Sequence, residues 1–220
     1  MTQPAPIERP PRFDAAFHAQ LEQLCRWRRD VRRFRSEPLD PGLLDRLIRL
    51  ALLSPSVGNS QPWRFVKVDD AHRRAGVRAS FVTCNQAALA TYEGERAALY
   101  ARLKLAGLDQ APVHLAVFAD SATGLGGGLG RRTMPETLTW SVVGAVQTLW
   151  LAARAHGVGV GWVSILDPAE VRSILSVPDA WSLVAYLCIG WPEEEHSDPE
   201  LHRAGWQPRV EDLHRVVVQR

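Results

Sequence analysis

A single carboxylate, Asp30, lies inside a dense cluster of arginines near the N-terminus. Arginine occupies six of the ten positions from Arg26 to Arg35. Guanidinium groups present planar pairs of donors that suit phosphate and carboxylate, so the cluster predicts an anionic ligand. A site that only holds phosphate would be weakened by Asp30, because like charges repel each other. Asp30 therefore either balances the charge of a solvated surface, which is the usual role of a charge run, or acts chemically beside a bound anion.

A second polar stretch runs from Ser54 to Trp63, between a predicted helix and a predicted strand, and reads SPSVGNSQPW. Its hydroxyl and amide side chains can hydrogen-bond to a polar heterocycle, and Pro62 restricts the backbone where the stretch ends. The same residue types are typical of ordinary turns. Taken by itself, the stretch supports a binding role and a plain turn equally.

The loop from Gly124 to Gly130 is rich in glycine and lies between a predicted strand and a predicted helix, which is the setting of a dinucleotide-binding loop. The G-x-G-x-x-G pattern fails at its sixth position, which is Leu129. No acidic residue ends a following strand about 20 residues on, where one would bind ribose. We therefore predict a mobile surface loop.

Other catalytic and metal-binding patterns are absent from the sequence. The histidines have no metal-ligand spacing such as HExxH, and no G-x-S-x-G elbow supports a serine hydrolase. His114 begins a predicted buried strand, so we interpret it as a core residue. The cysteines form no CxxC pair, which indicates reduced thiols and neither a disulfide framework nor a zinc site; they are Cys25, Cys84 and Cys188.

The composition is that of an ordinary globular protein. The chain has 220 residues, 46% of them hydrophobic and 23% charged, which fits one domain with a well-buried core. The net charge of +2 gives no indication of a nucleic-acid or membrane partner. Residues 1–13 are rich in proline without an apolar signal segment. We expect them to form a flexible arm of a cytoplasmic protein, followed by one domain over residues 14–220.

Hydrophobic periodicity predicts one central sheet flanked by helices. The expected strands are 64–68, 114–119, 158–163 and 182–189, with a terminal extended segment at 216–218. A helix is expected to begin with Asp40 as N-cap and Pro41 at the first helical position, and another begins by the same signal at Asp167-Pro168. The remaining helices are expected at 14–27, 71–90, 93–106 and 135–156. Helices and strands are mixed in order, which favours the α+β class.

The order of these motifs resembles the FMN-binding nitroreductase-like family over about residues 24–210. The matching features are an R-x-x-x-R segment, a helix, the PSxxNxQPW turn and a later Gly-Trp-Val-Ser strand end. The resemblance implies an α+β sandwich with a central mixed sheet flanked by helices, and a homodimer with flavin at the subunit interface. Segments 92–108, 130–137 and 161–168 resemble one branch of that family, the 5,6-dimethylbenzimidazole synthases.

That branch consumes its flavin. The resemblance implies that reduced FMN is the substrate and that molecular oxygen is the co-substrate, with no metal. The expected products are 5,6-dimethylbenzimidazole, the lower ligand of vitamin B12 (cobalamin), and the four-carbon sugar phosphate erythrose 4-phosphate. A separate NAD(P)H-dependent flavin reductase would supply reduced FMN. The alternatives are a conventional FMN-dependent NAD(P)H oxidoreductase acting on nitro compounds, quinones or cobalt corrinoids, and a flavin-binding module without catalysis.

The resemblance also implies roles for individual residues. Asp30 matches the catalytic carboxylate and would accept a proton from the ribityl chain, while Ser164 matches the catalytic hydroxyl near the ring. We expect the neighbouring arginines to keep Asp30 ionised, which weakens it as a base. Charge balance for Asp30 and helix capping for Ser164 are the alternatives, and residues 81–108 resemble a lid. The expected flavin-binding residues are Arg28, Arg29, Asp30, Val31, Arg32, Pro55, Ser56, Asn59, Gln61, Gly161, Trp162, Val163, Ser164 and Arg209.

Overall fold

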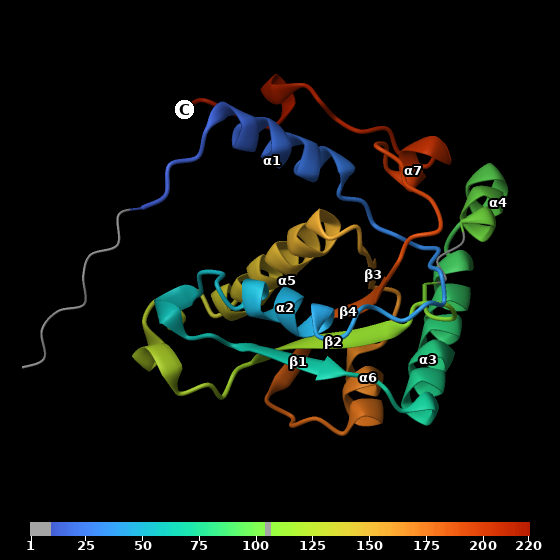
Figure 1. Ribbon diagram of the computed structural model, residues 1–220. Coiled ribbons are helices and arrows are strands. Elements are labelled where there is room, and N and C mark those ends of the chain that lie inside the picture. The colour runs from blue at the N-terminus through green and yellow to red at the C-terminus, as the bar shows by residue number, and fades with distance from the viewer. Residues whose placement is uncertain (1–9, 104–106) are drawn as a thin grey trace, which may run out of the picture.

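The computed structural model describes residues 10–103 and 107–220 (Figure 1). Residues 1–9 of the predicted arm, and residues 104–106 of the predicted helix and lid, lie outside the described residues. The helices are α1 (Ala15–Trp27), α2 (Leu43–Ala51), α3 (Ala71–Leu89), α4 (Gly94–Arg102), α5 (Thr137–Ala155), α6 (Pro168–Leu175) and α7 (Glu200–Arg203). The strands are β1 (Trp63–Lys67), β2 (Val113–Asp120), β3 (Gly159–Val163) and β4 (Trp181–Gly190). Short 3-10 turns are η1 (Val57–Asn59), η2 (Leu125–Gly128) and η3 (Leu213–Arg215).

The four strands form one sheet in the order β1-β2-β4-β3, and each neighbouring pair is antiparallel. Helices α3 and α4 return the chain to the end of the sheet where β1 stops, so β2 starts beside Lys67 and runs back along β1. The predicted α+β class is confirmed, but the strand directions are not mixed among these four strands. Within the described residues, parallel pairing is limited to one bridge between Asp30 and Val160.

The sheet separates two hydrophobic cores. Every residue of the central strand β2 is buried, as its nearly continuous apolar run predicts. Helices α2 and α5 cover one face, where Leu47 and Val146 pack in one cluster with Leu187 of β4. Helices α3 and α6 cover the other face around Phe118. Figure 1 shows this layering, with α5 and α6 on opposite sides of the sheet.

An aspartate side chain caps the start of α1, α3 and α6, whereas α2, α4, α5 and α7 begin without a side-chain cap. The Asp167 side chain accepts hydrogen bonds from the first backbone N–H groups of α6, and Pro168 occupies the first helical position, as predicted. The start predicted at Asp40-Pro41 is wrong, because α2 begins at Leu43 after Gly42, whose φ of 76° is left-handed. Asp40 and Pro41 instead form a turn in which the Asp40 carbonyl accepts the Leu43 N–H at 3.1 Å.

The C-terminal part of the chain differs from the sequence prediction. Helix α7 forms where the sequence predicts no helix, and the extended segment expected at 216–218 follows the turn η3 without joining the sheet. Across residues 10–103 and 107–220, no helix has the length and apolar character needed to cross a membrane.

Candidate functional site

A cavity of about 260 Å³ opens beside the edge strand β3, where the segment after α1 crosses that strand. One wall comes from the crossing segment and the end of β3, with Cys188 of β4 behind them. The opposite side comes from α3, α4 and the C-terminal segment. The structure brings together seven of the predicted site residues at this cavity: Asp30, Val31, Arg32, Gly161, Trp162, Val163 and Ser164.

Close backbone contact with β3 fixes the position of Asp30. The Val31 N–H donates to the Val160 carbonyl at 3.0 Å, and the Trp162 N–H donates to Oδ1 of Asp30 at 2.9 Å. Glycine is required at position 161, because a Cβ atom there would lie 2.1 Å from the Val31 carbonyl oxygen. At the end of β3, Gly161 therefore leaves room for the Val31 carbonyl, and the Trp162 N–H donates to the Asp30 side chain.

The environment of Asp30 makes its carboxylate a stronger base than the sequence suggested. Its side chain is 40% exposed but lies in the wall of a recess, and desolvation there raises its pKa. The Trp162 N–H and Arg32, whose Nε is 3.4 Å from Oδ2, act in the opposite direction without cancelling this effect. The neighbouring arginines Arg32 and Arg28 do lower the pKa of Asp30, as expected, but desolvation outweighs them and the net shift is upward.

Desolvation is the main cause of the raised pKa of Asp30, and the direction of the other guanidinium groups limits how far they oppose it. The Arg28 guanidinium lies over the ring of Trp150, 4.9 Å from its centroid. Arg29 donates through Nη2 to the carbonyls of Cys25 and Arg26 at the end of α1. A charge that points away from a carboxylate stabilises it little, so sequence proximity overestimates the effect of these two arginines.

Three arginine nitrogens lie buried without a partner among the described residues, and two of them flank Asp30. These two are Nε of Arg29 and Nη1 of Arg32. Both side chains line a second, smaller cavity of about 30 Å³ that shares Asp30, Val31 and Arg32 with the first. Buried donors without an acceptor are costly, and an anion placed there would satisfy them. The same cavity is also lined by Glu194, Asp198 and Glu200, of which Glu194 and Glu200 pair with Arg33, so these two nitrogens are donors that an anion such as a phosphate can still meet.

Arg209 lies within electrostatic reach of the same group. Desolvation lowers the pKa of Arg29, and the positive charges of Arg28 and Arg209 lower it further. Arg33 differs, because its charge is already paired with Glu194 and Glu200. Positive charge near the small cavity therefore comes from Arg28, Arg29, Arg32 and Arg209, all of which the sequence had singled out, while Arg32 also contacts Asp30 and Asp198 acts on Arg29.

Ser164 follows the end of β3 and lines the larger cavity with an exposed side chain. Helix α6 has its own cap, since Oδ1 of Asp167 accepts from Ala169 N at 2.8 Å and from Glu170 N at 3.1 Å. The capping alternative for Ser164 therefore loses its basis. Within the described part of the chain its hydroxyl makes no hydrogen bond and stays available for a ligand.

The turn from Ser54 to Trp63 lies at the other edge of the sheet. It leads into β1, whereas the cavity lies at β3, and two strands spaced about 4.8 Å apart separate these edges, which is about 14 Å across three spacings. Asn59 and Gln61 have left-handed φ values of 55° and 44°, which are strained for residues other than glycine. One chain does not bring this turn to the cavity, so these flavin-binding candidates stay apart from Asp30: Pro55, Ser56, Asn59 and Gln61.

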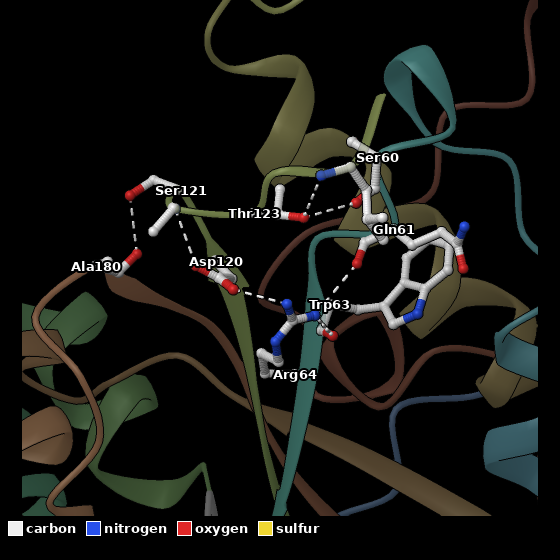
Figure 2. Close-up of polar contacts among 10 residues, drawn as sticks. Ser60, Gln61, Trp63, Arg64, Asp120, Ser121, Thr123 and Ala180 are labelled. Atoms are coloured by element: carbon white, nitrogen blue, oxygen red, sulfur yellow. Dashed lines mark hydrogen bonds and ion pairs between the residues drawn. The ribbon is translucent and has the colours of Figure 1, made fainter. Parts of the chain in front are cut away.

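Polar contacts hold this strained turn in place (Figure 2). Arg64 donates to the Gln61 carbonyl at 3.2 Å and forms an ion pair with Asp120 at 2.7 Å. Thr123 Oγ1 donates to the Ser60 carbonyl at 3.1 Å, as Figure 2 also shows. The strand ends of β1 and β2 therefore act together as the support of the turn.

The glycine-rich loop packs against this turn. A Cβ atom on Gly126 would lie 2.4 Å from the Gly58 carbonyl oxygen, and one on Gly58 would lie 2.7 Å from that of Leu129. Both glycines have left-handed φ values, of 75° and 55°. The loop from Gly124 to Gly130, predicted as a mobile surface loop, thus packs against the Ser54–Trp63 turn, and its glycines allow the two backbones to come into contact.

His114 is a core residue, as predicted. It is 1% exposed, and its Nδ1 shares a hydrogen bond of 2.9 Å with the Tyr186 hydroxyl. Desolvation lowers the pKa of His114 to about 4. Within the described ranges, no three His, Cys, Asp or Glu side chains gather closely enough to hold a metal ion.

Phe81 and Tyr100, which line the cavity, lie in the segment 81–108 that resembles a lid, whereas sequence reasoning missed Leu201 and Trp206 of the C-terminal segment. A signal for Trp206 was present, because Ala-Gly-Trp at 204–206 is typical of a helix that ends with glycine and is followed by an apolar residue. The polar surroundings of this segment hid it.

Comparison with known proteins gives three findings. The sequence model described as the Nitroreductase family matches residues 25–191. A protein of Rhodospirillum rubrum named 5,6-dimethylbenzimidazole synthase is 59% identical over 199 residues, which cover 90% of this chain and 94% of that protein. A protein of Rhodobacter capsulatus with the same name is 50% identical over 198 residues, covering 90% and 96%.

A solved structure has the same fold. The crystal structure of oxidized iodotyrosine deiodinase, bound to FMN and 3-iodo-L-tyrosine, superposes with a TM-score of 0.71 at 25% sequence identity. The superposition covers 91% of this chain and 97% of the deiodinase.

Proposed function

The chain belongs to the nitroreductase family, and we propose that it catalyses the oxygen-dependent fragmentation of reduced FMN to 5,6-dimethylbenzimidazole and erythrose 4-phosphate. This reaction supplies the lower ligand for vitamin B12 biosynthesis. The observation that carries the proposal is the position of Asp30, a carboxylate of raised pKa in the cavity wall beside two unpaired buried arginine nitrogens. High identity to two synthases over nearly the whole chain supports the same reaction.

Asp30 is the proton acceptor in this proposal. Reduced FMN supplies the electrons that reduce oxygen and the carbon atoms of both products, and the remaining carbon and nitrogen atoms of its pyrimidine ring leave as a separate fragment. Oδ1 of Asp30 is held by the Trp162 N–H, whereas Oδ2 has only a long contact of 3.4 Å with Arg32. Oδ2 is therefore the atom that accepts a proton from the ribityl chain, and the raised pKa strengthens it for this task.

The other cavity residues bind and orient. Arg29 and Arg32 satisfy their unpaired nitrogens on the phosphate, with Arg28 and Arg209 adding positive charge. Ser164 donates its hydroxyl hydrogen bond near the ring. Because the flavin is consumed, a separate NAD(P)H-dependent flavin reductase must deliver each molecule of reduced FMN. The free thiols fit a reducing cytoplasmic compartment.

We place the flavin at the interface of a homodimer. Proteins of this family are commonly dimers, and one chain keeps the Ser54–Trp63 turn at the sheet edge opposite its own cavity. A second copy can bring its turn to that cavity, with the exposed side chains of Asn59 and Gln61 facing the flavin. Each site is then built from the cavity of one copy and the turn of the other.

Hybrid dimers test this arrangement. Asp30→Asn disables the cavity side, and Asn59→Ala disables the turn side. If each site combines two copies, a hybrid has one site with both defects and one with neither. Equal amounts of the two variants are unfolded together and refolded, so that their chains pair at random. This should restore about a quarter of the wild-type activity, because half of the dimers are hybrids and each hybrid has one intact site out of two. Sites built within one chain would show no recovery.

The reaction itself is tested with purified protein, chemically reduced FMN and air, followed by mass analysis. We expect dimethylbenzimidazole and erythrose 4-phosphate, and loss of the flavin. Intact oxidised FMN as the sole flavin product would overturn the proposal. FMN surviving many turnovers with a nicotinamide and a nitro compound, quinone or corrinoid would identify a conventional oxidoreductase. Tight binding of reduced flavin without any oxygen-dependent product would identify a binding module.

Asp30→Asn separates binding from chemistry. The asparagine can keep the hydrogen bond from Trp162 through its carbonyl oxygen but cannot accept a proton. We expect the variant to bind oxidised FMN with an affinity near that of the wild type and to form no dimethylbenzimidazole. Product formation at the normal rate would show that Asp30 is not the base.

A further inference from the structure

The side of the 260 Å³ cavity that faces Asp30 is built from two segments far apart in the sequence. Phe81 of α3 and Tyr100 of α4 come from one segment. Leu201 of α7 and the following Trp206 come from the C-terminal segment. Figure 1 shows α4 and α7 at the same end of the molecule, in line with the aromatic contacts between them.

Three aromatic rings and one guanidinium join the two segments. We call Tyr92, Tyr100, Trp206 and Arg96 the aromatic clasp. The ring of Trp206 lies edge-on to Tyr92 with centroids 5.5 Å apart and is 6.0 Å from Tyr100. The Arg96 guanidinium carbon lies 3.9 Å from the Trp206 ring centroid, well within the range of a cation–π interaction. Tyr100 and Trp206 are the clasp members that also line the cavity.

The local sequence places Trp206 on the cavity by a helix-ending motif. Helix α7 ends at Arg203, and Gly205 follows with a left-handed φ of 74°. The Trp206 N–H donates to the Leu201 carbonyl at 2.8 Å, and the Gly205 N–H donates to the His202 carbonyl at 3.0 Å. This is the Schellman pattern, in which the residue after glycine packs against the third residue from the helix end. That pair is Trp206 and Leu201, and both line the cavity.

Each of the two segments joined by the aromatic clasp is anchored to the rest of the protein. The Tyr100 hydroxyl donates to Oδ1 of Asn85 on α3 at 2.8 Å. The C-terminal segment is held by ion pairs of Arg33 with Glu194 and of Arg154 with Glu195, the latter at 2.5 Å. The clasp is therefore the junction at which two separately anchored parts meet over the cavity.

We propose that Trp206 and Tyr100 close the cavity over the flavin ring and decide whether bound reduced FMN is broken down or released as oxidised FMN. This inference rests on the proposed function and names the residues that retain its substrate. Release without fragmentation is balanced: two electrons and two protons pass from reduced FMN to oxygen, giving oxidised FMN and hydrogen peroxide. Fragmentation requires the ring to stay beside Asp30 for longer than that escape takes. An aromatic cover that excludes water and packs on a planar ring provides this retention.

The test measures how reduced FMN divides between the two outcomes. Wild-type and variant proteins react with a limiting amount of chemically reduced FMN in air, and dimethylbenzimidazole, oxidised FMN and peroxide are quantified. For Trp206→Ala we expect the ratio of dimethylbenzimidazole to peroxide to fall about tenfold. Trp206→Phe keeps an aromatic ring and should give a ratio near that of the wild type. Tyr100→Phe loses only the contact with Asn85 and should give an intermediate ratio.

A binding measurement gives a readout that does not depend on turnover. The rate at which oxidised FMN leaves the protein, followed by flavin fluorescence, should rise about tenfold in Trp206→Ala. Trp181→Leu is the matched control, because Trp181 also has an arginine, Arg64, over its ring at 6.0 Å but lies outside the cavity. We expect it to lower thermal stability and to leave both the product ratio and the release rate unchanged.

The outcomes separate this inference from the proposed function. If the wild type makes no dimethylbenzimidazole, the proposed function fails. If the wild type makes it and Trp206→Ala has the same product ratio and release rate, the clasp inference fails alone. A ratio that falls equally in Trp181→Leu would trace the effect to general destabilisation and would also overturn the inference. If Trp206→Ala fails to fold, the other two variants still test the inference. The ratio of dimethylbenzimidazole to peroxide should be lower in Tyr100→Phe than in Trp206→Phe, and equal ratios would overturn the inference.

Discussion

Replacing Gly161 by alanine should displace Asp30, the proposed catalytic carboxylate, without changing its chemical identity. The added Cβ atom would lie 2.1 Å from the Val31 carbonyl oxygen, and real Cβ atoms essentially never approach closer than 3.0 Å. The crossing segment must therefore move by about 0.9 Å, the difference between these distances. Asp30 precedes Val31 and moves with it. A displacement of about 1 Å can reduce a rate about 100-fold, so we expect dimethylbenzimidazole formation to fall by about that factor.

The assay for Gly161→Ala combines single-turnover product formation with thermal unfolding. Overpacking should cost about 1–3 kcal/mol, and in a chain of this size each kcal/mol lowers Tm by about 2–4 °C. Gly124→Ala is the control, because Gly124 has an ordinary φ of −80° and no atom within 4 Å of its Cβ position. A folded Gly161→Ala protein with the wild-type rate of product formation would refute the argument that contact with β3 positions Asp30.

Three further predictions concern pH and the supporting turn. Because desolvation raises the pKa of Asp30, the acid limb of the rate profile should lie above the ordinary aspartate range and disappear in Asp30→Asn, as product measured across pH would show. Because the pKa of His114 is lowered to about 4, its stabilising contribution is complete above pH 6.5 and is lost as pH falls towards 4. That loss amounts to about 3 kcal/mol, so the free energy of unfolding should fall over this range in denaturant titrations and fall less in His114→Gln. Gly126→Ala should destabilise by at least about 1 kcal/mol, since its φ is 75° and its Cβ would meet Gly58, and in steady-state assays it should raise KM for reduced FMN more than it lowers kcat.

The features predictable from sequence are those determined by a few neighbouring residues. The cap at Asp167-Pro168 was predictable because the Asp167 side chain and the first turn of α6 satisfy each other locally. The same signal failed at Asp40-Pro41, because Gly42 adopts a left-handed conformation that delays the helix. A glycine two positions later thus outweighs a good capping pair.

The features that sequence could not predict depend on contacts between distant segments. The basicity of Asp30 depends first on its desolvation in the cavity wall, which Arg32 and Arg28 oppose without cancelling, and Arg28 lies over the Trp150 ring of α5. The separation of the Ser54–Trp63 turn from the cavity follows from the strand order, which local patterns do not encode. Trp206 belongs to the cavity only because the C-terminal segment returns across the molecule to α4.

The proposed site has two tasks, removal of a proton from the flavin and retention of the flavin, and a conventional flavin oxidoreductase does not need to combine them. Passing electrons requires a flavin that is held while one ring face stays accessible to the second substrate. Here Asp30, the proposed base of raised pKa, and the proposed aromatic cover line the same cavity, so in this proposal proton removal and retention act on one bound molecule. Desolvation of Asp30 in the cavity wall destabilises its charged form, and a protein that only recycled flavin would gain nothing from that cost. The desolvated carboxylate and the aromatic side of the cavity are therefore explained together by the proposed function, as parts of a site that retains its flavin until the flavin is destroyed.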